Sequence, residues 1–409
     1  MTQNHENIVV GLDIGTTKIC CVVGQVSGQR VSIIGIGTSP SKGLRKGVVV
    51  DIQTTVESIK RAVAEAEYMA GHEINSVYAG IAGGHISGFN SRGIVAIKGP
   101  EVTPEDVGRV INQARAVSIP MDREVIHVLP QEYIVDDQDG IQNPVSMAGV
   151  RLEAKVHIVT GAVASANNIV KCANRAGLDV CDIVLESVAS SEAVLTQVER
   201  QLGAALLDMG GGTTDLAVFA GNQIKHTYVL ALGGDNLTND IAFGVSVPPE
   251  EAERIKKRFG SCLPAGIKED ESIEVPGIGG RAPRRLPRQI LGEILEPRME
   301  EIFDLIKREI IRADMEHLVS SGVVVTGGTS LLEGLPEIAD AVLELPVRVG
   351  TPRKIGGLVD LVNNPMYATG VGLVLYGAKE TADKRFRISE NNIFDTIILR
   401  MKKWFQEVF

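Results

Sequence analysis

The sequence predicts an α/β protein that consists of two similar halves with one ligand site between them. An apolar strand, a glycine turn flanked by acidic residues and a second apolar strand follow one another at 206–219. A similar arrangement occurs about 195 residues earlier, at 8–23, and a third glycine turn follows an apolar strand at 322–334. Because a ligand loop is repeated within the chain, we expect two half-domains that face the same ligand.

The segment 206–219 is typical of a β-hairpin whose turn binds a phosphate group. Consecutive glycines allow positive φ angles and bring backbone N–H donors close to an anion. Threonine hydroxyls add donors, and the Asp208 carboxylate is a hard oxygen ligand for Mg²⁺, directly or through water. The phosphate contacts that we expect here are Gly210, Gly211, Gly212, Thr213 and Thr214. Taken alone, the segment is also compatible with an ordinary glycine-rich hairpin.

The hairpin at 8–23 repeats this pattern with Asp13 in the place of Asp208. We therefore expect the two carboxylates to flank one Mg²⁺ ion from opposite hairpins. The residues expected to contact phosphate on this side are Gly15, Thr16, Thr17 and Lys18.

The third turn places Gly327 and Gly328 between an apolar strand and a predicted helix. A helix N-terminus and a backbone without side chains suit a phosphate or a base. A second glycine pair, Gly233 and Gly234, opens another predicted helix, and we assign it to the same ligand.

These three turns, in this order, resemble the phosphate-one, phosphate-two and adenosine motifs of the superfamily of actin, sugar kinases and DnaK-type chaperones. The resemblance implies an actin-like ATPase fold, with two ribonuclease-H-like halves around a nucleotide cleft that binds ATP and Mg²⁺. The chain has no G-x-x-x-x-G-K-[ST] motif. It also lacks a G-x-G-x-x-G at a strand-to-helix junction, so P-loop and dinucleotide-binding folds are disfavoured.

The same resemblance suggests further site residues. In the superfamily, a Glu or Gln at the head of a connecting helix helps to position the attacking water, and Glu186 matches it. An acidic residue that is favoured there only by the helix dipole would look the same. The helix at 248–259 resembles the adenosine-contacting helix, through Glu253, Lys256 and Lys257, although exposed i,i+3 and i,i+4 ion pairs have the same spacing.

Composition restricts the class of protein. Among the 409 residues, 41 basic and 51 acidic side chains give a net charge of −10, which disfavours a nucleic-acid partner. The five cysteines show no C-x-x-C pair, so we expect reduced core residues rather than a zinc site or disulfides. The polar N-terminus and the lack of a long apolar run predict a chain that is neither exported nor membrane-spanning.

Residues 84–162 interrupt the first half with an α+β module. Thr103 begins a capping box with proline at the first helical position, and strand-like runs flank this helix at 94–97, 125–129 and 155–159. The module lacks a recognisable catalytic group, so we expect a partner-binding surface. Each of His127 and His157 alternates with apolar residues on a strand, which favours a packed or solvent-facing histidine over a metal ligand.

The last 17 residues, 393–409, predict an amphipathic helix that follows a polar linker at 384–392. Its apolar face would lie in a membrane interface, with Arg400, Lys402 and Lys403 toward anionic headgroups. The apolar residues are Ile393, Phe394, Ile397, Ile398, Met401, Trp404, Phe405 and Val408. A terminal helix that packs on its own core is the alternative.

A divided actin-like ATPase with this insert and this C-terminus resembles the FtsA family of bacterial cell-division proteins over essentially the whole chain. The resemblance implies ATP-dependent self-association into filaments at the inner face of the membrane, at the division septum. It also implies tethering of FtsZ filaments through their C-terminal peptide, and recruitment of later divisome proteins through the insert. It leaves open whether the chain hydrolyses ATP.

We expect the following division of the chain. The first half comprises 1–83, 163–196 and 366–383, with the insert at 84–162. The second half comprises 197–229 and 303–365, with a small subdomain at 230–302.

Other members of the superfamily remain as alternatives. A metabolite kinase needs an acidic base in a second pocket, and we find no such base. A chaperone needs a peptide-binding domain for which too few residues remain. A pilus-assembly or shape-determining relative is the third alternative. The pilus-assembly relative would share the insert, but we would not expect it to carry the aromatic tail.

Overall fold

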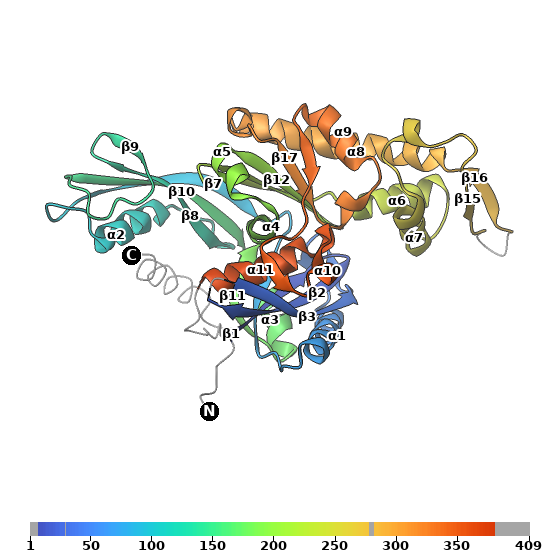
Figure 1. Cartoon of the computed structure of the whole chain (residues 1–409), viewed down its shortest axis with the longest axis horizontal. Helices are drawn as coiled ribbons and strands as arrows, with labels where there is room; N and C mark the ends of the chain where they lie inside the picture. The colour runs from blue at the N-terminus through green and yellow to red at the C-terminus, as the bar shows by residue number, and fades with distance from the viewer. Residues whose placement is uncertain (1–6, 29, 278–281, 381–409) are drawn as a thin grey trace.

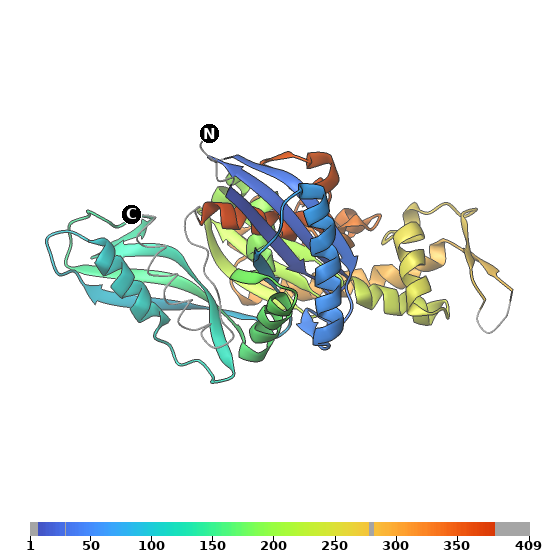
Figure 2. The same ribbon diagram turned by 90° about the horizontal axis from the view of Figure 1, so that it is seen from below.

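The computed structural model describes residues 7–28, 30–277 and 282–380. Two central sheets carry the insert at one end of the molecule and a small helical subdomain at the other (Figure 1). In the view from below, α1 and α3 cover the outer face of the first-half sheet (Figure 2). Helices α4 and α11 lie on the opposite face of that sheet, toward the second half.

The first-half sheet has the strand order β11-β6-β1-β2-β3-β19. Its strands are β1 (Asn7–Ile14), β2 (Lys18–Ser27), β3 (Arg30–Pro40), β6 (Ser76–Ile81), β11 (Asp179–Leu185) and β19 (Ile355–Gly357). A short hairpin follows β3, formed by β4 (Leu44–Arg45) and β5 (Val48–Val49).

The second-half sheet has the order β14-β13-β12-β17-β18. Its strands are β12 (Ala204–Met209), β13 (Thr214–Ala220), β14 (Gln223–Leu230), β17 (Val323–Thr326) and β18 (Val347–Val349). In each half the first three strands are antiparallel and two parallel strands follow beside the first strand. The internal repeat predicted from the two hairpins therefore extends to five strands in each sheet, and β19 is an additional strand beside β3 in the first half.

Helix α1 has a cap at each end. Asp51 caps α1 by accepting a hydrogen bond from the Thr54 backbone N–H at 3.1 Å, and Gly71 ends that helix with a φ of 67°. In the first half the helices are α1 (Ile52–Ala70), α3 (Val163–Arg175), α4 (Glu186–Val194) and α11 (Ala368–Lys379). In the second half and its connections they are α5 (Gln197–Leu202), α8 (Gln289–Arg312), α9 (Leu335–Leu343) and α10 (Val359–Val362).

The small subdomain is built on helices that cross the N-terminal part of α8. It contains α6 (Gly234–Gly244), α7 (Pro249–Phe259) and the projecting hairpin of β15 (Ser272–Val275) and β16 (Arg284–Pro287). Short 3₁₀ turns lie at η1 (Pro264–Gly266), η2 (Glu316–Leu318), η3 (Gly328–Leu331) and η4 (Pro365–Tyr367). In the part of the chain that is described, no helix has the length and apolar character needed to cross a membrane.

The insert is a four-stranded antiparallel sheet with one helix on one face. Its strands, in the order β7-β10-β8-β9, are β7 (Ser87–Ala96), β10 (Arg151–Ala162), β8 (Arg123–Val135) and β9 (Gln138–Ile141). Helix α2 (Pro104–Arg115) begins with the predicted capping box at Thr103 and Asp106. It packs over a core of its own, formed by residues such as Val110, Val156 and Ile158.

The opposite face of the insert contacts the edge strand β14 of the second half. Lys225 forms a bulge in β14, since Val218 pairs with His226 and Phe219 pairs with Ile224. The side-chain amide of Gln131 donates to the carbonyl oxygens of Ile224 at 3.0 Å and Lys225 at 2.9 Å. The insert, which is covalently part of the first half, is thus also bonded to the second half.

A buried histidine extends this contact. His157 is fully buried; its Nδ1 lies 2.7 Å from Asn90 Oδ1 and its Nε2 lies 2.8 Å from Thr227 Oγ1. Burial and the neighbouring His226 lower the pKa of His157 to about 3. His157 is therefore a neutral, hydrogen-bonded residue at the contact between the insert and β14.

The insert also buries a carboxyl group without a partner. Glu124 on β8 is 2% exposed, and neither carboxyl oxygen has a hydrogen bond among the described residues. Burial raises the pKa of Glu124 to about 7. Between its ordinary pKa and about pH 7, the unfolded chain releases this proton and the folded chain keeps it, so the free energy of unfolding falls as the pH rises.

We therefore expect Glu124→Gln to stabilise the protein at pH 8, on the order of 2 kcal/mol, and to have a smaller effect at pH 5. Urea unfolding followed by circular dichroism at both pH values measures this difference. The exposed Glu57→Gln on α1 is the control and should leave the unfolding midpoint unchanged. A loss of stability at pH 8 in the Glu124 variant would contradict the assignment of a buried carboxyl without a partner.

Candidate functional site

The first two glycine turns lie directly against each other where the two sheets meet. A Cβ atom at Gly211 would lie 1.8 Å from Thr17 Oγ1, and one at Gly212 would lie 2.4 Å from Thr16 Oγ1. Thr16 Oγ1 also accepts a hydrogen bond from the Gly47 backbone N–H at 2.9 Å. Only glycine allows this approach, so the two turns predicted from distant parts of the sequence form one site.

Each turn is closed by its own backbone. The Gly15 N–H donates to the Lys18 carbonyl at 3.1 Å, and the Gly210 N–H donates to the Thr213 carbonyl at 2.9 Å. The Thr214 hydroxyl, which we expected to face an anion, donates to the Leu232 carbonyl at 3.0 Å. The N–H groups of Gly15 and Gly210 and the Thr214 hydroxyl thus hold the hairpins in shape.

The end of β1 carries an ion pair. Asp13 is 6% exposed, and Lys18 Nζ lies 3.1 Å from its Oδ2 atom. Burial disfavours the Lys18 ammonium, but neighbouring groups, the Asp13 carboxylate first among them, together offset this and raise the pKa of Lys18. A predicted metal ligand and a predicted phosphate contact therefore neutralise each other in this structure.

Two carboxylates occupy paired positions on the two strands of the second hairpin. Asp208 at the end of β12 is directly opposite Asp215 at the start of β13, and both are buried. Burial raises the pKa of Asp208 to about 6, against the hydrogen bond from the Thr369 hydroxyl at 2.9 Å. Burial and the Asp208 charge raise the pKa of Asp215, whose Oδ1 has no hydrogen-bond partner among the described residues.

Glu186 is the first residue of α4 and belongs to this group of acids. Desolvation, followed by the charges of Asp13, Asp215 and Asp208, raises the pKa of Glu186 well above its ordinary value. The structure thus brings the predicted catalytic residue into electrostatic contact with both predicted metal ligands. A carboxyl group with a raised pKa beside other carboxylates is a candidate for proton transfer or for holding a water molecule.

The protein alone does not form a closed metal site here. No group of three or more His, Cys, Asp or Glu side chains in the described ranges is arranged to hold a metal ion. This arrangement fits Mg²⁺, which usually takes one or two carboxylates and completes its shell with phosphates and water.

The third glycine turn leaves room for the Asp208 side chain, and no α-helix begins at it. Gly327 has a φ of 85°, and a Cβ there would lie 2.6 Å from Asp208 Oδ1 and 2.5 Å from the Met209 carbonyl oxygen. The 3₁₀ turn η3 follows at Gly328, and α9 begins only at Leu335, so the expected α-helix N-terminus beside the glycines is absent from this turn.

The second glycine pair packs on the phosphate-two turn. The Gly234 N–H donates to the Gly210 carbonyl at 3.0 Å, and a Cβ at Gly233 would lie 2.7 Å from that same oxygen. Lys256 Nζ donates to the Gly234 carbonyl at 2.8 Å and lies 2.6 Å from Glu253 Oε2. Lys257, with an exposed side chain, lies 3.2 Å from Glu253, so these three residues form one ion-pair cluster beside Gly234.

Sequence reasoning missed two residues of this site. Asp215 was visible as the second acid beside the glycine turn, but no pattern distinguished it from a solvent-exposed strand end. Thr369 carried no signal, since it lies 161 positions from Asp208 in a run of small residues. The eight predicted membrane-contacting residues between Ile393 and Val408 lie outside the described residues.

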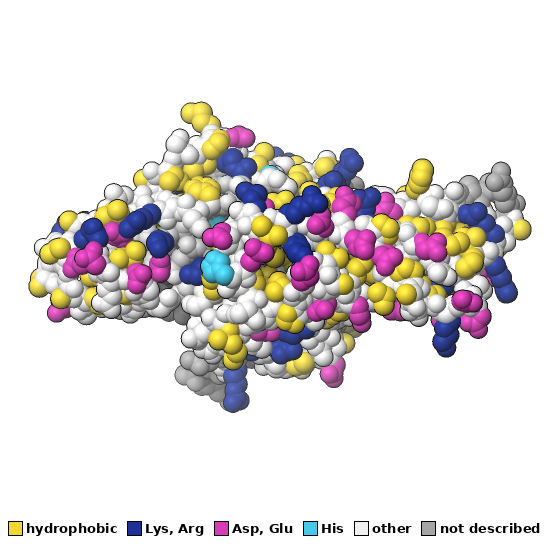
Figure 3. Space-filling view, turned by 90° about the horizontal axis from the view of Figure 1, so that it is seen from above, with side chains coloured by type: hydrophobic (Ala, Val, Ile, Leu, Met, Phe, Trp, Pro, Cys, Tyr) yellow, Lys and Arg dark blue, Asp and Glu magenta, His cyan; other side chains and the backbone are white. Residues whose placement is uncertain are grey.

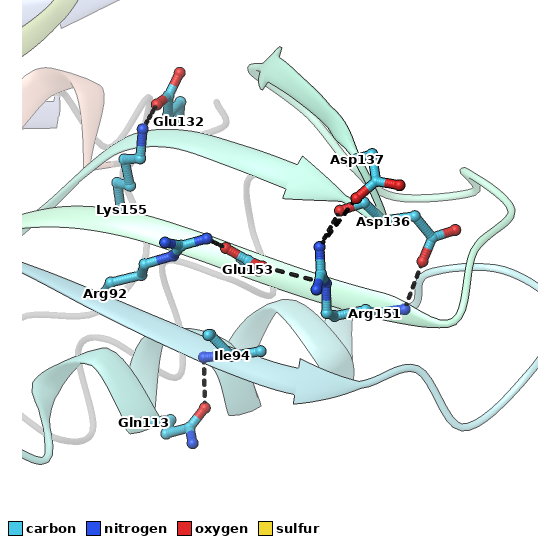
Figure 4. A network of polar contacts seen from close by, with 9 residues as sticks. All are labelled: Arg92, Ile94, Gln113, Glu132, Asp136, Asp137, Arg151, Glu153 and Lys155. Atoms are coloured by element: carbon cyan, nitrogen blue, oxygen red, sulfur yellow. Dashed lines mark hydrogen bonds and ion pairs between the residues drawn. The ribbon is translucent and has the colours of Figure 1, made fainter.

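The insert presents a separate polar surface beyond its contact with β14 (Figure 4). The Glu153 carboxylate is buried between Arg92, with which it forms an ion pair, and Arg151 at 3.2 Å. Lys155 pairs with Glu132 on the next strand at 2.5 Å. Most of the charges on this surface are therefore already paired within the insert.

A side chain covers part of the insert's open edge. The Ile94 backbone N–H on edge strand β7 donates to Gln113 Oε1 at 2.6 Å, which blocks strand pairing there (Figure 4). Viewed from above, acidic and basic side chains are interspersed along the molecule (Figure 3). This face offers no broad basic area for a nucleic acid.

Comparisons with known proteins identify relatives over the whole chain. A family profile described as "Cell division protein FtsA" matches residues 205–372, and one described as "SHS2 domain inserted in FTSA" matches residues 83–160. The "Cell division protein FtsA" of Pseudomonas aeruginosa is 47% identical over 98% of each chain. That of Escherichia coli K12 is 42% identical over 99% of each chain, and that of Bacillus subtilis is 38% identical over 92% of this chain and 85% of the relative.

Solved structures show the same fold at low identity. The "PilM-PilN type IV pilus biogenesis complex" has a TM-score of 0.67 at 16% identity, and the match covers 90% of this chain and 98% of that one. MreB5 of Spiroplasma citri, bound to ADP, has a TM-score of 0.54 at 15% identity, with coverage of 91% and 97%. The actin-like ATPase fold expected from the three glycine turns is confirmed.

Proposed function

Because the chain belongs to the FtsA family of cell division proteins, we propose that it binds Mg²⁺·ATP between its two halves and links division filaments to the membrane. The contact between the two phosphate-type turns, with buried carboxylates around it, is the observation that carries this proposal. A phosphate group together with a divalent cation would balance the charge of these carboxylates and occupy the space beside the turns.

Asp13 and Asp208 would hold Mg²⁺, which would neutralise charge on the phosphates. The Lys18 ammonium, now paired with Asp13, would be available to a phosphate once the cation compensates that carboxylate. Glu186 would hold the water molecule if the protein hydrolyses ATP. Residues of α6 and α7, including Glu253 and Lys256, would contact the nucleoside.

We assign the remaining parts of the function to other regions. The tail 393–409 would anchor the protein to anionic lipid at the cytoplasmic side of the inner membrane, at the division septum. The molecule would self-associate head to tail into filaments and bind the C-terminal peptide of FtsZ. Residues 84–162 would recruit later division proteins through the charged surface around Glu153.

The turn contact predicts how a side chain at Gly211 affects nucleotide binding. Gly211→Val would place its methyl groups against Thr17 and in the space proposed for phosphate, so Mg²⁺·ATP affinity should fall at least about tenfold. Isothermal titration calorimetry measures this change. Gly108→Val is the control, since a Cβ at Gly108 has open space around it; unchanged affinity in the Gly211 variant would contradict the assignment of the phosphate turn.

Glu186 allows a test that separates binding from hydrolysis. Glu186→Ala and the isosteric Glu186→Gln should slow any ATP turnover on the order of 10²-fold, because the water would lose its acceptor. Their ATP affinity should stay near that of the parent, because Glu186 is assigned to the water molecule and not to the phosphates or to Mg²⁺. Loss of binding together with a lower melting temperature would instead identify Glu186 as a structural residue at the start of α4.

Substitutions in the tail distinguish a membrane anchor from a helix that packs on the protein's own core. Large apolar side chains each gain about 1.5–3 kcal/mol on leaving water, so Trp404→Glu with Phe405→Glu should abolish co-sedimentation with anionic vesicles. ATP affinity should be unchanged, and vesicle-dependent recruitment of FtsZ should be lost. The matched control, Thr396→Glu with Gln406→Glu, adds the same charge to the polar face and should retain most of the vesicle binding.

A docked C-terminal helix gives the opposite pattern. The parent protein would then not bind vesicles, and the Trp404 and Phe405 variant would melt at a lower temperature. That outcome would contradict the membrane-tethering part of the proposal.

A further inference from the structure

Helix α11 belongs to the first half but contacts a carboxylate of the second. Its body packs on β1 and α4; a Cβ at Gly11 would lie 2.5 Å from the Gly370 carbonyl oxygen, and one at Gly372 would lie 1.9 Å from the Ala189 carbonyl oxygen. In the first turn of this helix, Thr369 Oγ1 donates to Asp208 Oδ2 at 2.9 Å. Both residues are less than a tenth exposed, so this hydrogen bond is shielded from water.

The other oxygen of Asp208 is confined by the backbone. Gly327, in its left-handed conformation, leaves room for Asp208 Oδ1 where any Cβ would lie 2.6 Å away. The carboxylate is therefore held between the third glycine turn on one side and the Thr369 hydroxyl on the other. The glycine contributes only space, and the Ser190 hydroxyl, although close enough to lower the pKa of Asp208, has no hydrogen-bond partner among the described residues. Thr369 is therefore the side chain that donates a hydrogen bond to this carboxylate.

We infer that Thr369 is a positioning residue that orients Asp208 toward the Mg²⁺·nucleotide complex and ties this orientation to the first half. The inference rests on the proposed function. Helix α11 is rigidly seated on the first-half sheet through its glycines, so the hydroxyl fixes Asp208 relative to Asp13 on β1. Without it, the carboxylate of one hairpin would lose its alignment with that of the other.

The test compares nucleotide affinity with and without the cation. We define the Mg²⁺ enhancement as the ratio of the ATP dissociation constant in EDTA to that in saturating Mg²⁺, both measured by calorimetry on the full chain. Thr369→Val keeps the shape and removes the donor, whereas Thr369→Ser keeps the donor. Since a hydrogen bond to a charged group is strong, Thr369→Val should lower the enhancement about tenfold and leave the affinity in EDTA within about twofold of the parent.

Two controls make the result specific. Thr369→Ser should retain the enhancement of the parent. Thr55→Val removes another buried helical hydroxyl of the first half, one that donates to the Asp51 carbonyl at 2.6 Å, and it should also leave the enhancement unchanged. Melting temperatures of all variants report packing separately, and Thr369→Ala is the substitute if the valine variant does not fold.

The outcomes are distinguishable. An enhancement in Thr369→Val equal to that of the parent would overturn this inference alone, and so would an equal loss in Thr369→Ser. A parent protein that shows no Mg²⁺ enhancement would overturn the proposed cation site and this inference with it. Loss in the valine variant only, with both controls normal, supports the positioning role.

Discussion

The structure gathers four carboxyl groups at one point between its two sheets; those of Asp13, Asp208 and Asp215 are buried, and that of Glu186 is half-buried beside them. Asp13, Asp208, Asp215 and Glu186 come from both halves. Withdrawing carboxylates from water opposes folding, and it raises the pKa values of Asp208, Asp215 and Glu186. The surrounding structure offsets only part of this cost, through Lys18 at Asp13 and Thr369 at Asp208. Active sites commonly retain such incompletely compensated buried charges, since a bound cation and anion can compensate them.

Close packing of backbone around this acidic group explains why glycine recurs in the sequence. At Gly211, Gly212 and Gly327, a side chain would overlap atoms of another segment, and in the first two cases that segment belongs to the opposite half. The two halves meet directly at the site, because the glycines of one turn lie against the Thr16 and Thr17 hydroxyls of the other. The binding site thus exists only where the two halves contact each other.

The insert adds a second connection between the halves. It emerges from the first half, yet Gln131 and His157 bond it to edge strand β14 of the second. The bulge at Lys225 makes this possible, since it exposes carbonyl oxygens that the amide of Gln131 takes up. Any movement of one half against the other must therefore move the insert or break these bonds, which gives a physical route from the site to the surface around Glu153.

The sequence by itself determined the repeated hairpins, the order of strands and helices, and the α+β insert, because each depends on local periodicity, caps and glycine turns. It also identified the glycines, Asp13, Asp208 and Glu186, since these stand at the ends of recognisable elements. Only the tertiary structure decided that Asp215 joins the acidic group, that Gly327 makes room for Asp208, and that Thr369 reaches it from 161 positions away. These contacts depend on how elements that are distant in the sequence pack together. A local pattern of residue types does not specify that packing.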